Sequence, residues 1–483
     1  MAALNRCEQL IRGGVVVDGT GAPPVSADVA VEGDRIVGVG ALDGVGADVV
    51  IDARGLMVAP GFIDAHTHDD RAVLASPGMD AKVSQGVTSV VSGNCGISLA
   101  PLADQEPPPP LNLLGAKAWF RFPSMESYFQ ELDAKPSAVN VVPLVGHSTL
   151  RVGTMDRLDR PATADEVAAM AEMVESSMRA GAVGMSTGLA YPTANAAPTE
   201  EVIALAEVAS RHAGIYATHM RDERDQVVAS VRETLTIGQA AALPVVISHH
   251  KCTGKQNWGL TKETLALIES ARATQTVDLD VYPYTASSTV LLEDFAAQST
   301  RVLVTWSEPY PELAGRELKD IAKALGGTLS SVIQRLQPAG AIYFQMDEAD
   351  LQRVMCFDGA MIGSDGLPHD VHPHPRLWGT FPRVLGHYVR ELGLQPIEEM
   401  VHRMTGRTAR VFGLADRGEI RANAFADLVL FDANTVIDNA TFDAPTRPAA
   451  GIKQVWVNGE TVWSSGESTG SRPGRRLTRT PST

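Results

Sequence analysis

Short apolar runs recur through the middle of the chain, and longer stretches with another pattern separate them. In residues 163–180, 199–212 and 223–241, apolar positions repeat at spacings of three and four, which is typical of amphipathic helices. Eight strands that alternate with helices predict a parallel (β/α)8 barrel. The strand-like runs are residues 60–68, 88–95, 140–147, 182–187, 214–219, 244–251, 277–282 and 361–365.

The two ends of the chain have a different pattern, in which β-type runs follow one another with turn residues between them. Residues 10–60 contain a Gly33-Asp34 turn, and residues 453–463 place two strands around Asn458-Gly459. Neither end has enough strands to close a core, so we expect the two ends to pair into one β-sandwich. The predicted domains are residues 1–60 with 415–483, and a barrel over 61–414. The last twenty residues, rich in Ser, Gly, Thr and Arg, predict a solvated tail.

One connection in the barrel is much longer than the others. The segment from about 286 to 345, between the seventh and eighth strands, is longer than one connection needs and predicts an insertion. On the strand-to-helix side of a barrel, such a segment can form a lid or part of a specificity wall, and a plain surface excursion is the alternative.

Histidines, a cysteine and an aspartate gather where the predicted strands end. The active sites of barrels lie at these carboxyl ends, and alternation along the first strand sends His66 and His68 to the same side. Two solvated loop histidines are the alternative for that pair alone. Neutral imidazole is a common zinc ligand, so the full set predicts a metal site. The residues at the strand ends are His66, His68, Cys95, His147, His219, His249, His250, Lys251, Tyr282 and Asp365.

Composition narrows the possible partners and the compartment. A net charge of −16 argues against a nucleic acid or an anionic membrane as the partner. No window offers the roughly 18 apolar residues of a spanning helix, and the N-terminus lacks the pattern of a signal peptide. Four scattered cysteines indicate a reducing compartment. We therefore expect a cytoplasmic protein with a small-molecule partner.

These features resemble the amidohydrolase superfamily over nearly the whole chain. The resemblance rests on the paired termini, on Gly61-Phe-Ile-Asp-Ala-His-Thr-His68, on single histidines that end strands five and six, and on Ser364-Asp365. Many members bridge two metals with a carbamylated lysine from strand four, but residues 185–191 offer neither lysine nor glutamate. Cys95 is a candidate replacement, because a thiolate is a strong zinc ligand. A buried structural cysteine is the alternative, and it is the one expected for Cys7, Cys252 and Cys356.

Within that superfamily the chain resembles the N-acyl-D-amino acid deacylases, or D-aminoacylases. The motifs that carry this resemblance are residues 146–151, 218–223, 248–251, 362–368 and 374–379. It implies one tightly held zinc on Cys95, His219 and His249, and a weaker second position at His66, His68 and Asp365. Alternation alone does not choose between His249 and His250. The resemblance selects His249 and places Lys251 on its side.

Zinc in such a site lowers the pKa of a bound water and polarises a carbonyl group. Asp365 is predicted to act as general base and then as general acid, a role compatible with metal ligation. Arg376 is predicted to bind the α-carboxylate of the substrate. The resemblance adds Lys251, Tyr282 and Ser288 to that role, and Tyr191 as a donor to the oxyanion. His147 is either substrate-facing or a positioning residue.

The predicted function is zinc-dependent hydrolysis of N-acyl-D-amino acids to a carboxylate and a free D-amino acid. Residues 291–295 are apolar and acidic, which favours neutral or hydrophobic side chains, although Arg301 or Lys255 could supply a cation for acidic ones. The alternatives are an N-acyl-D-glutamate or N-acyl-D-aspartate deacylase, a cyclic-amide hydrolase or deaminase, and a catalytically silent scaffold. The D configuration follows only from the resemblance, and the spacing of residues does not fix the oligomeric state.

Overall fold

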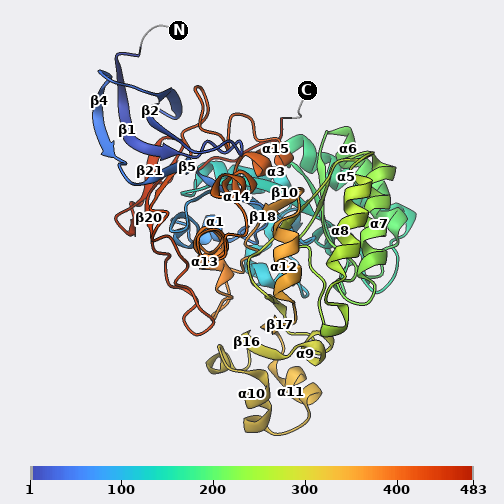
Figure 1. The fold of residues 1–483 in the computed structure, drawn as a ribbon. Coiled ribbons are helices and arrows are strands. Elements are labelled where there is room, and N and C mark those ends of the chain that lie inside the picture. The colour runs from blue at the N-terminus through green and yellow to red at the C-terminus, as the bar shows by residue number, and fades with distance from the viewer. Residues whose placement is uncertain (1–3, 481–483) are drawn as a thin grey trace.

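The barrel occupies the centre of the molecule in the computed structural model, which describes residues 4–480 (Figure 1). Eight parallel strands lie in the order β18-β14-β13-β12-β11-β10-β7-β6. Hydrogen bonds from Ala65 N to Ile362 O and from Asp365 N to His66 O join the first strand to the last. The predicted barrel is therefore confirmed. Its strands are β6 (Phe62–Asp64), β7 (Val87–Ser92), β10 (Asn140–Gly146), β11 (Gly184–Gly188), β12 (Ile215–His219), β13 (Val245–Ile247), β14 (Val277–Val281) and β18 (Ala360–Ile362).

Helices cover the outside of the barrel. The longest, α5, begins after Thr163, whose hydroxyl accepts from Glu166 N while the Glu166 carboxylate accepts from Thr163 N. Helix α7 begins four residues later than the sequence predicts, and residues 222–225 form a loop over the carboxyl end of the barrel. Every helix among residues 4–480 is too short or too polar to span a lipid bilayer. The helices are α1 (Ala72–Ala75), α2 (Asp80–Val83), α3 (Met125–Ala134), α4 (His147–Thr154), α5 (Ala164–Ala180), α6 (Thr199–Arg211), α7 (Val227–Ala241), α8 (Thr261–Ala271), α12 (Glu348–Met355), α13 (Arg376–Arg383), α14 (Ile397–Met404) and α15 (Gly406–Phe412).

The two termini pair into one sheet beside the barrel, as predicted (Figure 1). The sheet has nine strands and curves so far that Arg35 on the edge strand β3 forms a bridge with Phe425, which precedes β19 in the middle of the strand order. Asn458 and Gly459 both have positive φ, which gives the expected tight turn between β20 and β21. The strands are β1 (Arg6–Val16), β2 (Val25–Glu32), β3 (Arg35–Gly40), β4 (Gly46–Asp52), β5 (Met57–Pro60), β19 (Leu428–Phe431), β20 (Ile452–Val457), β21 (Glu460–Ser464) and β22 (Glu467–Ser468).

The basic segment near the C-terminus corrects a prediction. Residues 474–480 do not form a solvated tail, because their backbone bonds to the barrel: Leu477 N donates to Val141 O, and Thr480 N donates to Gly413 O. Arg479 Nε donates to Ala213 O at 2.8 Å. Composition did not reveal this packing, because the acceptors are carbonyl groups far away in sequence. Residues 481–483 lie outside the described chain.

The predicted insertion forms a small unit of its own at the far end of the molecule from the termini (Figure 1). Three antiparallel strands lie in the order β15-β17-β16, and three helices pack against them. A second, short pair of strands, β8 (Leu102–Ala103) and β9 (Arg121–Phe122), flanks the Pro107–Pro110 loop. The elements of the insertion are β15 (Ala286–Val290), α9 (Glu293–Gln298), β16 (Arg301–Ser307), α10 (Leu318–Leu325), α11 (Leu329–Leu336) and β17 (Ala339–Phe344).

Candidate metal centre and catalytic pocket

Cys95 lies on a tight loop that follows the second barrel strand. Its φ is 53°, and Gly93 and Gly96 on either side also have positive φ. A Cβ at Gly93 would lie 2.1 Å from Leu144 O, so only glycine fits there. Ser186 on the fourth strand bonds to both sides of the loop: it accepts from Gly96 N at 3.0 Å and donates to Gly93 O. Strand four thus supports the cysteine loop instead of providing a ligand.

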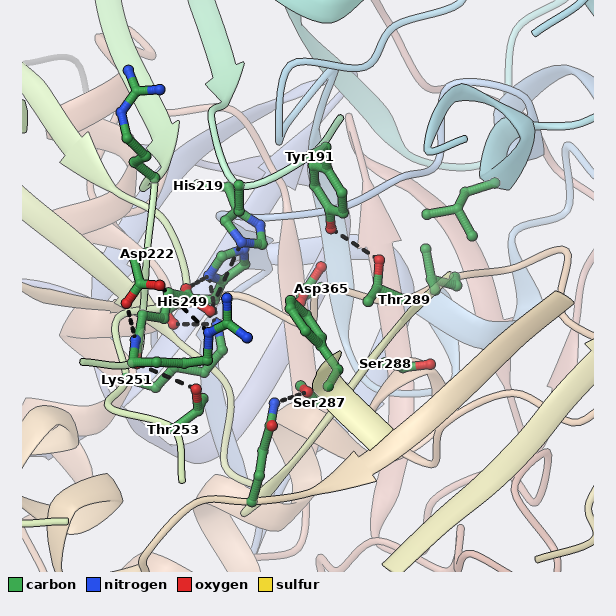
Figure 2. Close-up of a pocket in the computed structure, with 18 of the residues that line it drawn as sticks. Tyr191, His219, Asp222, His249, Lys251, Thr253, Ser287, Ser288, Thr289 and Asp365 are labelled. Carbon is green, nitrogen blue, oxygen red and sulfur yellow. Dashed lines mark hydrogen bonds and ion pairs between the residues drawn. The ribbon is translucent and has the colours of Figure 1, made fainter. Parts of the chain in front are cut away.

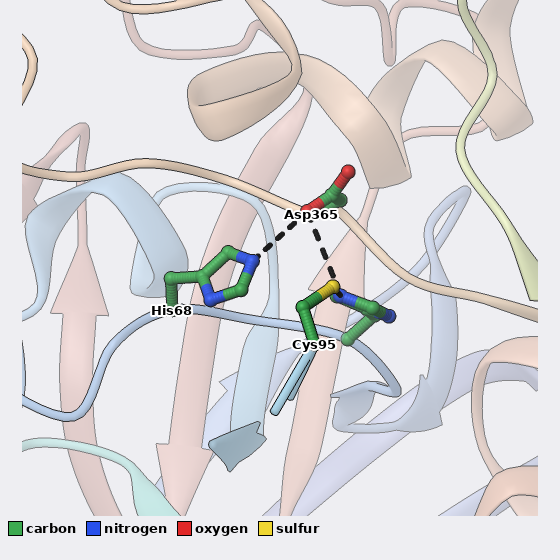
Figure 3. A group of neighbouring side chains, drawn as sticks. His68, Cys95 and Asp365 are labelled. Carbon is green, nitrogen blue, oxygen red and sulfur yellow. Dashed lines mark hydrogen bonds and ion pairs between the residues drawn. The ribbon is translucent and has the colours of Figure 1, made fainter. Parts of the chain in front are cut away.

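The first and eighth strands bring His66, His68 and Asp365 to the same point. Figure 3 shows His68 and Asp365 beside Cys95. His66 Nε2 lies 3.3 Å from Cys95 Sγ and 3.5 Å from Asp365 Oδ1, and His68 Nε2 lies 3.2 Å from the same carboxylate oxygen. All four side chains are buried. Burial alone would raise the pKa of Asp365, but Arg376 and the two histidines hold it well below its usual range. Asp365 is therefore ionised at neutral pH.

Cys95 also belongs to a second group, with His219 and His249. Its Sγ lies 3.3 Å from His249 Nε2, and one candidate ligand atom from each of the three residues lies within 4.8 Å of the other two. Neighbouring ligands of a tetrahedral zinc lie about 3.5 Å apart, given the usual Zn–N and Zn–S bond lengths. Neither ring nitrogen of buried His219 has a hydrogen-bond partner among residues 4–480. A donor set of one thiol and two imidazoles, one of them without a partner, fits a zinc ion.

The electrostatics of Cys95 agree with a ligand role. Burial opposes ionisation of the thiol, yet His66 and His249 hold its pKa well below the usual value. His250, by contrast, points away from the cluster: its Nε2 lies 2.8 Å from Thr264 Oγ1 on α8. The structure thus separates the two adjacent histidines that alternation left open. Cys95, His249 and Asp365 all have positive φ, a strained conformation that is common at functional sites.

Two carboxylates beside the histidines were missed by the sequence analysis. Glu223 Oε1 lies 3.0 Å from His249 Nδ1 and 2.7 Å from Lys251 Nζ, and Asp280 Oδ2 lies 3.3 Å from His66 Nδ1. Such contacts fix the orientation of a ligating imidazole. The sequence held an indication of each carboxylate. Glu223 is the last residue of the 218–223 motif, and Asp280 lies two residues before Tyr282, on the same face of the strand.

Arg376 is fully buried behind Asp365. Its Nη2 donates to Asp365 Oδ2 at 2.9 Å and to Ser288 O at 3.1 Å, and its guanidinium lies 4.5 Å from the centre of the Tyr282 ring. Its Nε and Nη1 have no hydrogen-bond partner among residues 4–480. Two buried donors without partners favour an anionic ligand on this side of the aspartate.

The pocket in front of the cluster is lined by the barrel loops and by the insertion (Figure 2). Of the predicted substrate-binding residues, Lys251, Tyr191 and Ser288 line it, whereas Arg376 and Tyr282 lie behind this lining. The Tyr191 hydroxyl is 2.9 Å from Thr289 Oγ1 of the insertion. The sequence analysis did not select the other lining residues from the insertion. They are Ser287, Thr289, Phe295 and Gln345.

The third strand ends in a buried ionic group outside the metal cluster. His147 Nε2 lies 3.0 Å from Glu201 Oε1, and the same oxygen accepts from Arg151 Nη1. His147 does not line the pocket. Burial lowers the pKa of His147, which is therefore neutral at pH 7. This position gives no support to a substrate-facing role for His147, and the positioning role stays a prediction.

Replacing Glu201 with glutamine is expected to destabilise the fold. Burial opposes its ionisation, but His147 and Arg151 lower the pKa of Glu201 from 4.5 to about 2. A lowered native pKa stabilises the fold above the unfolded pKa, and this contribution disappears as pH falls from about 4.5 to 2. The variant leaves Arg151 buried without its partner, so we expect a loss of about 3–5 kcal/mol at pH 7. Urea unfolding at pH 7 and pH 3 checks it: the difference from the wild type should shrink at pH 3.

Comparison with known proteins agrees with this geometry. A family model described as the amidohydrolase family matches residues 49–254 and 358–463, which leaves out the insertion. The D-aminoacylase of Alcaligenes xylosoxydans xylosoxydans is 54% identical over 471 residues, which cover 98% of this chain and 97% of the relative. The N-acyl-D-aspartate deacylase of the same organism is 51% identical, with 97% and 94% covered.

Solved structures give the same result. A D-aminoacylase studied for its binuclear metal centre has a TM-score of 0.96 and 54% identity, with 98% of this chain and 100% of that one covered. An N-acyl-D-glutamate deacylase from Bordetella bronchiseptica, complexed with zinc and a phosphonate inhibitor that mimics the tetrahedral intermediate, has a TM-score of 0.94 and 45% identity, with 98% and 99% covered. The chain belongs to the amidohydrolase family and, within it, to the group that contains the D-aminoacylases.

Proposed function

We propose that the protein is a zinc-dependent N-acyl-D-amino acid deacylase, which cleaves the amide bond to give a carboxylate and a free D-amino acid. The observation that carries the proposal is the pairing of two features in one pocket. Cys95, His219 and His249 form a donor set for zinc, and an ionised carboxylate, Asp365, lies beside it. Relatives that match nearly the full chain are D-aminoacylases and N-acyl-D-amino acid deacylases.

Cys95, His219 and His249 would hold the tight zinc ion, and His66, His68 and Asp365 a weaker second one. When bound, zinc makes a water molecule more acidic and polarises the scissile carbonyl group. Asp365 takes the proton from the attacking water on its carboxylate and delivers it to the departing nitrogen. Because Arg376 keeps the pKa of this carboxyl low, Asp365 begins the cycle as a base.

The remaining pocket residues bind and orient the substrate. Lys251 and Ser288 meet the α-carboxylate from the pocket wall, and we assign to the same carboxylate the unpartnered Nε and Nη1 groups of Arg376, which lie behind that wall beside Tyr282. The Tyr191 hydroxyl donates to the oxygen that becomes negative as the carbonyl is attacked. Burial and the charge of Cys95 keep the pKa of Tyr191 well above its usual value, so the hydroxyl holds its proton.

The side-chain pocket favours neutral or hydrophobic D-amino acids. Arg301 pairs with Glu317 at 2.9 Å, and neither Arg301 nor Lys255 lines the pocket. The cation in the lining that faces the insertion is Arg224, which pairs with Asp222 and lies 5.3 Å from the centre of the Phe295 ring. Its charge is therefore already partly neutralised. Selectivity for acidic side chains stays the alternative.

Hydrolysis of N-acetyl-D-leucine is expected to exceed that of N-acetyl-L-leucine by at least about 100-fold in kcat/KM, because the inverted centre misplaces either the carboxylate or the carbonyl. N-acetyl-D-methionine should react similarly, and N-acetyl-D-glutamate and N-acetyl-D-aspartate at least about tenfold more slowly. The assay measures release of the free amino acid, and zinc content is measured on the same sample. It tests both the preference for D-substrates and the preference for neutral side chains. Faster hydrolysis of the L-substrate would refute the proposed function, and faster hydrolysis of D-glutamate would refute the side-chain preference alone.

Cyclic-amide hydrolysis on the same scaffold has no observation in its favour here. The fourth strand, which carries the bridging lysine in many superfamily members, ends in Ser186, Thr187 and Gly188. Dihydrouracil and hydantoin, included in the same assay panel, are expected to give no ring opening.

A cytoplasmic location and the domain boundaries at about residues 60 and 415 stay predictions.

A further inference from the structure

The strand pair that closes the barrel is joined differently from the other neighbouring pairs. Those pairs form parallel ladders, although the β6–β7 ladder shifts register between Phe62 and Ile63, whereas residues 62–64 and 360–362 of β6 and β18 form no ladder. The seam depends on single bonds such as Ala65 N to Ile362 O, at 3.2 Å, and on an isolated bridge between Thr67 and Gly366. The residues that follow these two strands are His66, His68 and Asp365. Three of the six candidate metal ligands therefore lie next to the strand pair that forms no ladder.

A buried lysine crosses this seam. Lys82, on the short helix α2 between the first two strands, donates to Asp64 Oδ2 at 2.8 Å and to Ser364 Oγ at 2.9 Å. Asp64 belongs to the first strand, and Ser364 precedes Asp365 after the eighth. A third partner, Asp69, follows His68, and its Oδ2 lies 3.2 Å from Lys82 Nζ. We call Lys82, Asp64, Asp69 and Ser364 the seam cluster.

The seam cluster also fixes the backbone that bears the ligands. Asp64 Oδ1 accepts from Ser364 N at 2.7 Å and from His66 N at 3.4 Å, and Ser364 Oγ accepts from Gly366 N at 3.2 Å. All four side chains of the cluster are at most 1% exposed. Without the lysine, the buried carboxylates of Asp64 and Asp69 on the first-strand side would have no countercharge, and Ser364 on the eighth-strand side would lose its donor.

We propose that Lys82 is a positioning residue of the metal centre, which holds the ends of the first and eighth strands together so that His66, His68 and Asp365 converge. The inference rests on the proposed function in that it takes these three residues as the second metal position and the proton carrier. It predicts that loss of Lys82 weakens this position selectively. The Cys95, His219 and His249 group depends on strands two, five and six and should be spared.

Metal binding to the full-length protein tests the proposal without an activity assay. Lys82→Met, Lys82→Arg and Ser364→Ala are stripped of metal, and zinc is titrated against a chromophoric chelator. For Lys82→Met we expect the second zinc to bind about 10- to 100-fold more weakly, the cost typical of losing an outer partner of a metal ligand. The first zinc should shift less than about threefold. Lys82→Arg should recover part of the loss, and Ser364→Ala should weaken the second zinc without removing a charge.

The matched control is Arg417→Met. Arg417 forms a buried ion pair with Asp427 beside the terminal sheet, far from the metal centre along the chain and in contact with none of its residues. This variant also removes the cation of a buried pair, and it should leave both zinc affinities unchanged. Equal weakening in Lys82→Met and Arg417→Met would overturn the proposal, because it would indicate general loosening.

Hydrogen exchange provides a second measurement that needs no metal. In the metal-free protein, peptides over residues 62–70 and 360–368 should exchange at least about tenfold faster in Lys82→Met than in the wild type, while a peptide over 215–219 should not change. If the wild type takes up one zinc ion only, the hydrogen-exchange comparison between Lys82→Met and the wild type alone tests the proposal. If Lys82→Met fails to fold, Ser364→Ala takes its place in both measurements. Unchanged exchange at the seam would overturn the proposal. An inactive wild type would refute the proposed function and leave these measurements intact.

Discussion

Replacing Asp365 with asparagine is expected to lower kcat by about 10²- to 10⁴-fold, the usual contribution of a general acid–base group. The amide has nearly the same shape and can still accept from His68, but it cannot carry a proton. It also loses the ion pair with Arg376, which lies at 2.9 Å in the wild type. KM for N-acetyl-D-leucine should change much less than kcat, because the groups offered to the substrate carboxylate remain.

The zinc on Cys95, His219 and His249 should persist in Asp365→Asn, so metal content is measured on the same sample. Asp278→Asn is the matched control: Asp278 is a buried aspartate at the opposite end of a barrel strand, 3.5 Å from Arg407. Its kcat should stay close to that of the wild type. A zinc-loaded Asp365→Asn enzyme with a kcat within tenfold of the wild type would show that another group carries the proton.

The parts of the fold that the sequence predicts are those with local patterns. The eight barrel strands are apolar runs with helices between them, and Asn458-Gly459 marks its turn by residue type alone. The cysteine loop could also be anticipated, because the glycines at 93 and 96 indicate a tight turn with positive φ on both sides of Cys95. In each case the information lies within a few residues of the feature that it predicts.

The features that the sequence does not predict depend on contacts between residues that are distant in sequence. Lys82 lies on a one-turn helix, and nothing near it indicates that it contacts Ser364, which is 282 residues away. The segment over 474–480 looks disordered by composition, yet it is held by backbone carbonyls of the barrel. Arg376 shows a third kind of limit: its sequence position suggests a carboxylate binder, but its depth behind Asp365 and its ion pair with that residue appear only in three dimensions.

Replacing Cys95 with serine is expected to abolish tight zinc binding and, with it, nearly all activity. A serine hydroxyl keeps its proton at neutral pH, whereas the thiol of Cys95 has a pKa held well below its usual range by His66 and His249 against the effect of burial. Loss of an outer partner alone costs roughly 10- to 100-fold in metal affinity, so loss of the anionic ligand itself should cost roughly 100-fold or more. Equilibrium competition with a chelator measures the zinc affinity of Cys95→Ser and of the wild type.

The same variant should lose the stabilisation that zinc gives to the fold. Free zinc at about 1,000 times the dissociation constant adds about 4 kcal/mol to wild-type stability, and at the same concentration Cys95→Ser should gain far less. Cys252→Ser is the control, because Cys252 is equally buried and lies outside both donor groups. It should bind zinc as the wild type does. If Cys95→Ser kept wild-type zinc affinity, the sulfur would be structural, and the ion would have to be held by the histidines and Asp365 alone.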